Sequence, residues 1–239
     1  MTDPKAAGDA SRELHGSVLF ALGTAVVSGD LAPGTVLTLE GLCGEYAVSR
    51  SVAREAVRVL ESMGLMASRR RVGVTVLPRT SWNVFDPRVI RWRLDSSDRV
   101  DQLLSLSELR RGIEPVAAAL AAGRATPEHC RDLAIAVSDM EVHGRSGNLG
   151  PYLLADQLFH RTLLRASGNE MLASLGEVIA EVLSGRTHHG MMPDRPNPEA
   201  VALHDAVARA VRGGDAVGAE RAMRAIIDEA SAAMSELGS

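Results

Sequence analysis

The chain has 239 residues and a formal net charge of −4, with 46% hydrophobic and 23% charged residues. This composition is typical of a folded globular protein and excludes both a wholly disordered chain and a generic polyanion binder. Two distant cysteines, Cys43 and Cys130, argue against a disulfide scaffold or a zinc–thiolate site and fit a reducing compartment. No signal peptide and no apolar run of about 18 residues is present, which predicts a cytoplasmic protein without a membrane partner.

The first 79 residues show the pattern of a winged helix-turn-helix domain. Residues 1–10 are polar and rich in Ala and Gly, which predicts a disordered tail. In residues 11–79, apolar periodicity, a Pro-Gly turn and a serine cap predict three helices, and two short apolar runs on either side of a basic tip predict a hairpin. The expected helices cover residues 14–27, 39–46 and 49–63, and the expected strands cover residues 65–67 and 72–76. Three helices followed by a hairpin is the winged helix-turn-helix order.

Residues 46–79 form a basic stretch in an otherwise acidic chain, with seven arginines and two acidic residues. Arg50, Arg54 and Arg58 are spaced four apart and therefore share one face of the third predicted helix. Arginines on such a helix reach guanine edges or phosphates in the DNA major groove. A solvated charged face would explain an isolated arginine stripe, but here the stripe, the turn and a basic hairpin occur in order. Double-stranded DNA is therefore the expected partner of this domain.

The segment from residue 29 to residue 76 resembles the N-terminal domain of GntR-family bacterial transcription factors. The resemblance is carried by Pro33-Gly34, Leu42-Cys43, Val48-Ser49-Arg50, Arg54-Glu55-Ala56, Leu60, Gly64-Leu65 and Gly73. It implies DNA contacts from the start of the third helix and from the wing, at Ser49, Arg50, Ser51, Arg54, Arg70, Arg71 and Gly73. Many members carry an arginine in the second helix where this chain has Glu40. That position often contacts DNA in the family, so we expect this chain to lack one base contact and to bind an operator that differs from the usual one.

Residues 80–97 have the pattern of a linker with one short helix. Both tryptophans, Trp82 and Trp92, fall here, and Asp86-Pro87 predicts a helix with proline at its first position. We expect this helix to pack the linker against a core. From residue 98 to residue 239 only helices are predicted, over residues 98–123, 127–145, 149–167, 169–186, 197–212 and 215–237. The expected fold is mainly α: an N-terminal winged helix-turn-helix domain followed by an all-α antiparallel bundle.

Polar residues within the predicted bundle indicate a ligand site. Asp156 and His160 are four apart and share a helix face, and His204 heads a later helix with an apolar stripe. Arg110 and Glu114 are also four apart on the first long helix. A carboxylate and imidazoles that converge in a bundle can hold a divalent metal. Surface or hydrogen-bonded core histidines would show the same spacing, so the spacing alone leaves both interpretations open.

The bundle resembles the all-helical ligand-binding domain of the FadR subfamily of GntR regulators. The resemblance is carried by Glu108-Leu109-Arg110, Glu114-Pro115, Ala155-Asp156, Phe159-His160, Ser167-Gly168-Asn169 and His204-Asp205-Ala206. Subfamily members with a metal supply one Asp and three His, which implies a zinc- or nickel-type ion on Asp156, His160 and His204. Ile226 stands at the position of the third histidine, so the set is incomplete. Either His188 or His189 substitutes for it, or the polar residues bind the effector directly.

The segment from residue 82 to residue 92 is similar to regulators of sugar-acid catabolism, including gluconate and galactonate repressors. This similarity implies a small carboxylate effector bound by Arg110, Asp156, His160 and His204. Arg110 is the expected carboxylate anchor because a guanidinium forms two parallel hydrogen bonds to a carboxylate. An ion pair of Arg110 with Glu114 is the simpler role for that arginine. The alternative anchors are Arg161, Arg165 and Arg186.

The sequence thus predicts a transcriptional regulator, a repressor that a small carboxylate releases from a palindromic operator. Members of the subfamily are homodimers, and a two-fold protein reads a palindrome. Lactate, citrate or an acyl-CoA are the alternative effectors within this class. A metal-dependent helical enzyme is a further alternative, but no nucleophile–base pair accompanies the Asp/His cluster, so no enzymatic activity is expected. A DNA-packaging protein without a ligand is disfavoured by the acidic bundle and its polar residues.

Overall fold

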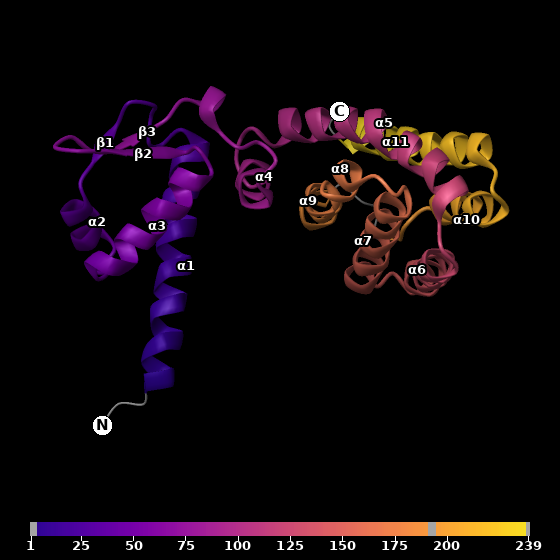
Figure 1. Cartoon of the computed structure of the whole chain (residues 1–239), viewed down its shortest axis with the longest axis horizontal. Coiled ribbons are helices and arrows are strands. Elements are labelled where there is room, and N and C mark those ends of the chain that lie inside the picture. The colour runs from indigo at the N-terminus through magenta and orange to yellow at the C-terminus, as the bar shows by residue number, and fades with distance from the viewer. Residues whose placement is uncertain (1–3, 191–194, 238–239) are drawn as a thin grey trace. The chain divides into compact units, whose positions relative to one another are not determined.

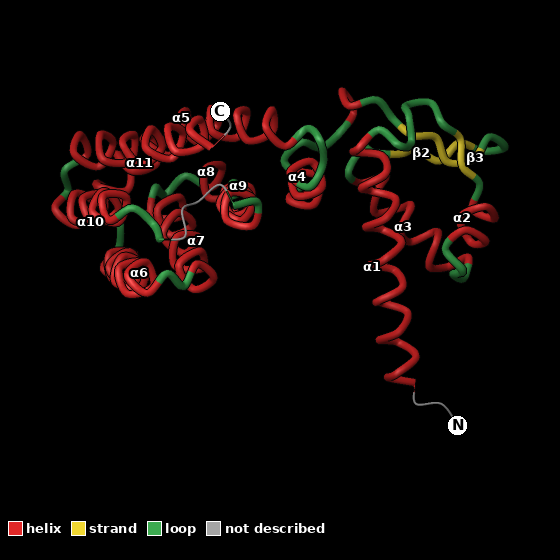
Figure 2. Tube along the Cα trace, turned by 180° about the vertical axis from the view of Figure 1, so that it is seen from behind, coloured by secondary structure: helices red, strands yellow, loops and turns green. Residues whose placement is uncertain are grey.

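The computed structural model describes residues 4–190 and 195–237, and the chain divides into two compact units, Met1–Val100 and Asp101–Ser239 (Figure 1). The first unit combines helices with a small sheet, and the described part of the second unit is helical (Figure 2). This confirms the predicted fold class. The segment expected to be a linker, residues 80–97, falls inside the first unit. None of the described helices is both long enough and apolar enough to cross a bilayer.

Helix α1 (Pro4–Ser28) begins earlier than the sequence pattern suggests. Residues 4–10, expected to lie in a disordered tail, are helical, while residues 1–3 lie outside the described residues. Proline suits the first turn of a helix, and the alanines that follow it have the highest helix propensity, so a polar composition does not prevent helix formation. Gly29, with a φ of 88°, takes the left-handed conformation that ends the helix.

Helices α2 (Leu39–Glu45) and α3 (Arg50–Ser62) form the expected helix-turn-helix. The side chain of Thr38 caps α2 by accepting a hydrogen bond from the backbone N–H of Gly41. Ser49 caps α3 by accepting one from the N–H of Val52 at 3.3 Å. Between them Ala47 has a φ of 52°, which lets the chain reverse within a few residues.

A three-stranded antiparallel sheet follows, in the order β1-β3-β2. Strands β2 (Met66–Arg69) and β3 (Gly73–Val76) form the predicted hairpin. The sequence pattern missed β1 (Val36–Leu37), because a two-residue strand has no periodicity of its own and is defined only by pairing with β3.

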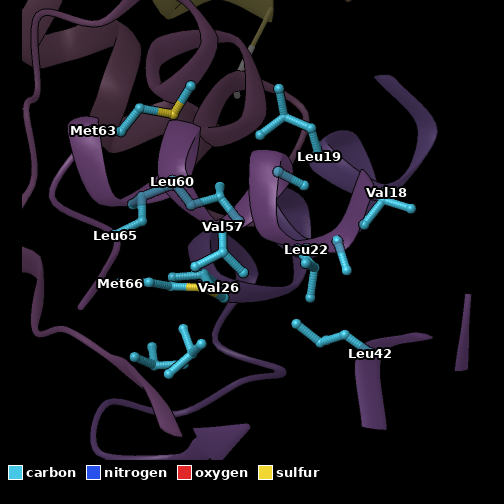
Figure 3. Packing of buried hydrophobic residues seen from close by; sticks show 14 of the residues in the cluster. Val18, Leu19, Leu22, Val26, Leu42, Val57, Leu60, Met63, Leu65 and Met66 are labelled. Carbon is cyan, nitrogen blue, oxygen red and sulfur yellow. The ribbon is translucent and has the colours of Figure 1, made fainter. Parts of the chain in front are cut away.

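Buried aliphatic and methionine side chains from α1, α3 and the start of β2 form the core of the first unit (Figure 3). Leu60, Met63 and Leu65 are fully buried there. Helix α4 (Pro87–Leu94), capped by Asp86 and preceded by the 3₁₀ turn η1 (Arg79–Ser81), joins the same core. The indole of Trp92 covers Gly23 of α1 so closely that the glycine has no room for a side chain. The linker helix is therefore part of the first unit's packing.

The second unit consists of α5 (Arg99–Arg124), α6 (Pro127–Ser146), α7 (Leu149–Ala166), α8 (Glu170–Ala173), α9 (Gly176–His188), α10 (Pro198–Gly213) and α11 (Ala216–Leu237). Helix α7 packs against both α6 and α9, and α10 packs against α6 and α11 (Figure 1). The helix expected over residues 169–186 is instead two helices, α8 and α9, which are separated by Ser174 and Leu175. After this break, α9 lies against α7, where the side-chain amide of Gln157 donates to the carbonyl of Ala180 at 3.1 Å.

Candidate functional site

The exposed face of α3 is basic. Arg50, Ser51 and Arg54 are exposed, and so is the cap Ser49, whose hydroxyl lies 2.9 Å from that of Ser51. The opposite face, with Ala53, Ala56 and Leu60, is fully buried in the core. A helix anchored by one face and basic on the other can enter the major groove without unfolding any part of the domain.

The hairpin between β2 and β3 presents a second basic surface. Arg70 and Arg71 at its tip are exposed. The carboxylate of Glu61 on α3 accepts a hydrogen bond from the backbone N–H of Ser68, which fixes the hairpin to the helix. Gly73 has a φ of 124°, and a Cβ there would lie 2.5 Å from the carbonyl oxygen of Leu37. Glycine is therefore needed at this position for the shape of the wing.

Glu40 lies in the first turn of α2 and is exposed. Its negative charge would face any phosphate that approaches this helix N-terminus. The departure from the arginine of many family members therefore changes the sign of the charge on this surface.

A group of polar side chains is buried inside the second unit, contributed by α5, α7 and α10. Asp156 and His160 project from α7, as the four-residue spacing predicts, and His204 comes from α10. The Oδ1 atom of Asp156 lies 3.3 Å from Nε2 of His160 and 3.2 Å from Nε2 of His204. Each of the three residues offers one potential ligand atom, and these three atoms lie within 4.8 Å of one another. Tertiary packing thus brings the three expected metal ligands together.

The hydrogen bonds of this group leave an opening for a cation. Nδ1 of His204 lies 2.6 Å from the carbonyl oxygen of Ala200, and a carbonyl only accepts, so Nδ1 carries the proton. In neutral His204 the lone pair of Nε2 then faces the Oδ1 oxygen of Asp156, and neither atom has a hydrogen-bond partner among the described residues. Two buried acceptors that face each other require a proton or a metal ion between them. The residues therefore fit a divalent metal.

Arg110 and Glu114 support His160 from α5. The guanidinium Nε of Arg110 donates to Oε1 of Glu114 at 2.5 Å, and both side chains are buried. The other carboxylate oxygen of Glu114 lies 2.5 Å from Nδ1 of His160, an ion-pair distance. A carboxylate beside the second nitrogen of a metal-binding histidine orients the ring and raises its basicity. Sequence spacing identified the Arg110–Glu114 pair but could not show that Glu114 reaches His160.

The charges in this group shift its pKa values strongly. Burial alone would raise the pKa of Glu114, but Arg110 and then His160 outweigh it and lower this pKa to about 2. Burial alone would lower the pKa of His160, but Glu114 and Asp156 outweigh it and raise this pKa to about 8. The pKa of Asp156, which burial alone would raise, is held well below its usual range by His160 and His204. Both carboxylates are therefore ionised at neutral pH.

A fourth protein ligand is absent from the described part of this cluster. Ile226, at the position of the missing histidine, is buried in the apolar core of the second unit. His188 and His189, at the end of α9, are outside the Asp156–His160–His204 group. The structure does not bring either histidine, which was one of the two alternatives for the missing ligand, into this group.

The candidate anchor arginines lie in different environments. Arg110 is buried and paired with Glu114, whereas Arg165 is exposed on α7. Arg161 forms an ion pair with Glu177 at 3.1 Å near the surface. Arg186, near the end of α9, is buried.

Comparisons with known proteins agree with this architecture. Residues 16–76 match the family of bacterial regulatory proteins of the gntR type, and residues 105–229 match the FCD domain. The galactonate operon transcriptional repressor of Escherichia coli is 29% identical over 92% of this chain and 96% of its own length. The transcriptional regulator LutR of Bacillus subtilis is 32% identical over 66% of this chain and 70% of its own.

The fold also matches a solved structure. The Escherichia coli protein McbR/YncC superposes with a TM-score of 0.56 and 18% identity, over 95% of this chain and 99% of that one. These families and relatives are transcriptional regulators and not enzymes. The chain belongs to the GntR family of bacterial transcriptional regulators, with a winged helix-turn-helix domain followed by an FCD domain.

Proposed function

We propose that this regulator is a repressor that binds a palindromic operator as a homodimer and releases it when a small carboxylate enters the FCD domain. In this proposal residues 11–79 bind DNA, residues 80–97 link the domains, and residues 98–239 bind the effector and dimerise. The similarity to a galactonate operon repressor along nearly the whole chain supports both repression and a sugar-acid effector such as galactonate or gluconate.

On the DNA side, the start of α3 would enter the major groove. Arg50 and Arg54, exposed one turn apart, would read base edges, while the hydroxyls of Ser49 and Ser51 donate to phosphates or bases. The exposed wing residues Arg70 and Arg71, with the half-buried Gly73 beside them, would approach the backbone or the minor groove. These roles rest on exposure, charge and the rigid attachment of both surfaces to the core.

The observation that carries the effector proposal is the buried group of Asp156, His160 and His204, with two acceptor atoms left unpaired. Unpaired acceptors are costly in a core and are typical of a binding site. These three residues would hold a zinc- or nickel-type ion. When bound, such an ion supplies a Lewis acid for the carboxylate and hydroxyl oxygens of a sugar acid. Arg110, whose Nη2 lies 3.4 Å from Nε2 of His160, borders the same site.

Release of DNA follows from linkage between the two sites. An effector that binds better to the FCD conformation with low operator affinity shifts the population toward that conformation. The effector needs no contact with DNA, because its differential affinity for the two states supplies the coupling free energy.

The test is a fluorescence anisotropy titration of the full chain on duplexes selected from a random library. Repression by this mechanism predicts a palindromic selected sequence, two chains bound per duplex, and release by D-galactonate or D-gluconate. D-Galactose, which lacks the carboxylate, is the control, and a parallel series with a chelator tests the metal. Release by lactate, citrate or an acyl-CoA but by neither sugar acid would overturn the effector class. One chain per duplex on a non-palindromic site would overturn the dimer model.

A further inference from the structure

The second unit contains a buried arginine that the site described above does not use. Arg186 is 8% exposed, and its Nε atom has no hydrogen-bond partner among the described residues. No described carboxylate forms an ion pair with it. A buried guanidinium whose Nε–H has no partner is unfavourable, because no hydrogen bond replaces the water that this group loses on burial.

Arg186 lies on α9, which packs against α7, the helix that carries Asp156 and His160. Burial lowers the pKa of its guanidinium, the charge of Arg110 lowers it further, and the attraction of Asp156 and Glu229 does not restore it. The buried phenol of Tyr152 responds to Asp156, Arg186 and Glu229 as well, and its pKa is raised, chiefly by burial and Asp156. Geometry agrees with this coupling: the side-chain amide of Gln157, next to Asp156 on α7, donates to Oγ of Ser184, two residues before Arg186 on α9, at 2.8 Å.

The two buried arginines of this region differ in how their charge is compensated. Arg110 donates twice to Glu114, from Nε at 2.5 Å and from Nη2 at 3.5 Å. Its charge is therefore neutralised within α5. Arg186 has no such neighbour, so an anion that enters this region gains more from Arg186 than from Arg110.

We propose that Arg186 is the residue that binds the carboxylate of the effector, and that Arg110 is a positioning residue that holds Glu114 beside His160. The inference deepens the proposed function and rests on it for the chemical class of the ligand. Arg186 would form two parallel hydrogen bonds to the carboxylate, and the hydroxyl groups of the acid would face Asp156, His160 and His204. A bound carboxylate would pair with the buried charge of Arg186 and so offset its desolvation, whereas a neutral sugar would not. The site would therefore bind a sugar acid in preference to the corresponding neutral sugar.

The test compares three substitutions of similar size in the full chain: Arg186→Met, Arg110→Met and, as the control, Arg165→Met at the exposed position on α7. Calorimetry measures binding of D-galactonate and D-gluconate, and thermal unfolding measures the melting temperature of the ligand-free proteins. We expect Arg186→Met to weaken acid binding by roughly 10- to 100-fold and to raise the ligand-free melting temperature. Arg110→Met should lower that temperature, because the buried carboxylate of Glu114 loses its arginine partner, and Arg165→Met should change neither property.

Binding by Arg186→Met within about twofold of wild type would overturn the proposal, and so would a fall in its ligand-free melting temperature. Arg186→Lys adds a second readout: it should recover only part of the affinity, since an ammonium cannot form the two parallel bonds. If wild-type protein binds neither acid, the effector class of the proposed function is wrong. The ligand-free melting temperature of Arg186→Met then still decides whether Arg186 is an uncompensated cation.

Discussion

Replacement of Glu114 by glutamine tests the electrostatic account of the second unit directly. Glu114 has no exposed surface and contacts Arg110 and His160. Glutamine has nearly the same shape, so the substitution removes the negative charge and leaves the packing intact. Arg110 then remains buried without the counter-ion that it contacts in the wild-type chain. We expect a clear loss of folding stability at neutral pH.

Two independent routes give the size of this loss. The pKa of Glu114 falls from an ordinary value of 4.5 to about 2, which corresponds to about 3 kcal/mol in favour of the ionised form in the folded state. Removing one partner of a buried ion pair generally costs about 3–5 kcal/mol. Because the folded pKa is depressed, this contribution is fully present above the unfolded value of 4.5 and is lost as the pH falls toward 2.

Urea unfolding of the full chain, followed by far-UV circular dichroism in the presence of a chelator, measures the effect. Glu108→Gln, at an exposed position on the same helix, is the matched control and should change stability by less than about 0.5 kcal/mol. The wild-type chain should lose more stability than Glu114→Gln on acidification below pH 4.5. A double variant, Arg110→Met with Glu114→Leu, should be more stable than Glu114→Gln, since no charge is left unpaired. A cost below about 1 kcal/mol for Glu114→Gln, or identical acid profiles, would refute the reasoning.

Three further outcomes are expected. Arg54→Ala should weaken specific operator binding by about 1–3 kcal/mol. Arg70→Ala should weaken binding to all sequences and reduce the slope of log binding constant against log salt concentration by about one. Equal losses of affinity on specific and random duplexes for both variants would contradict these roles. Gly73→Ala should distort the wing, because its Cβ would lie 2.5 Å from the Leu37 carbonyl, and gel shifts should show weaker binding to every duplex. Asp156→Asn should abolish bound zinc or nickel in elemental analysis, and equal metal content in both proteins would show that the ion binds elsewhere.

The sequence by itself determined the features that depend on neighbours a few residues apart. Ser49 caps α3, and Arg50 and Arg54 share an exposed face of that helix, because a helix repeats every 3.6 residues whatever it packs against. The same periodicity placed Asp156 and His160 together on α7. The position of His204 at the head of a later helix also singled it out, but only resemblance to a known family connected it to the other two residues, because spacing does not relate positions on different helices.

The tertiary structure decided what depends on distant parts of the chain. Strand β1 exists only because β3 pairs with it, and the break between α8 and α9 precedes the segment of α9 that hydrogen-bonds to Gln157 of α7. Likewise, the contact of Glu114 with His160 joins positions 46 residues apart. Which buried arginine is paired and which is not follows from these contacts, because charge compensation depends on distances between helices and leaves no periodic pattern in the sequence.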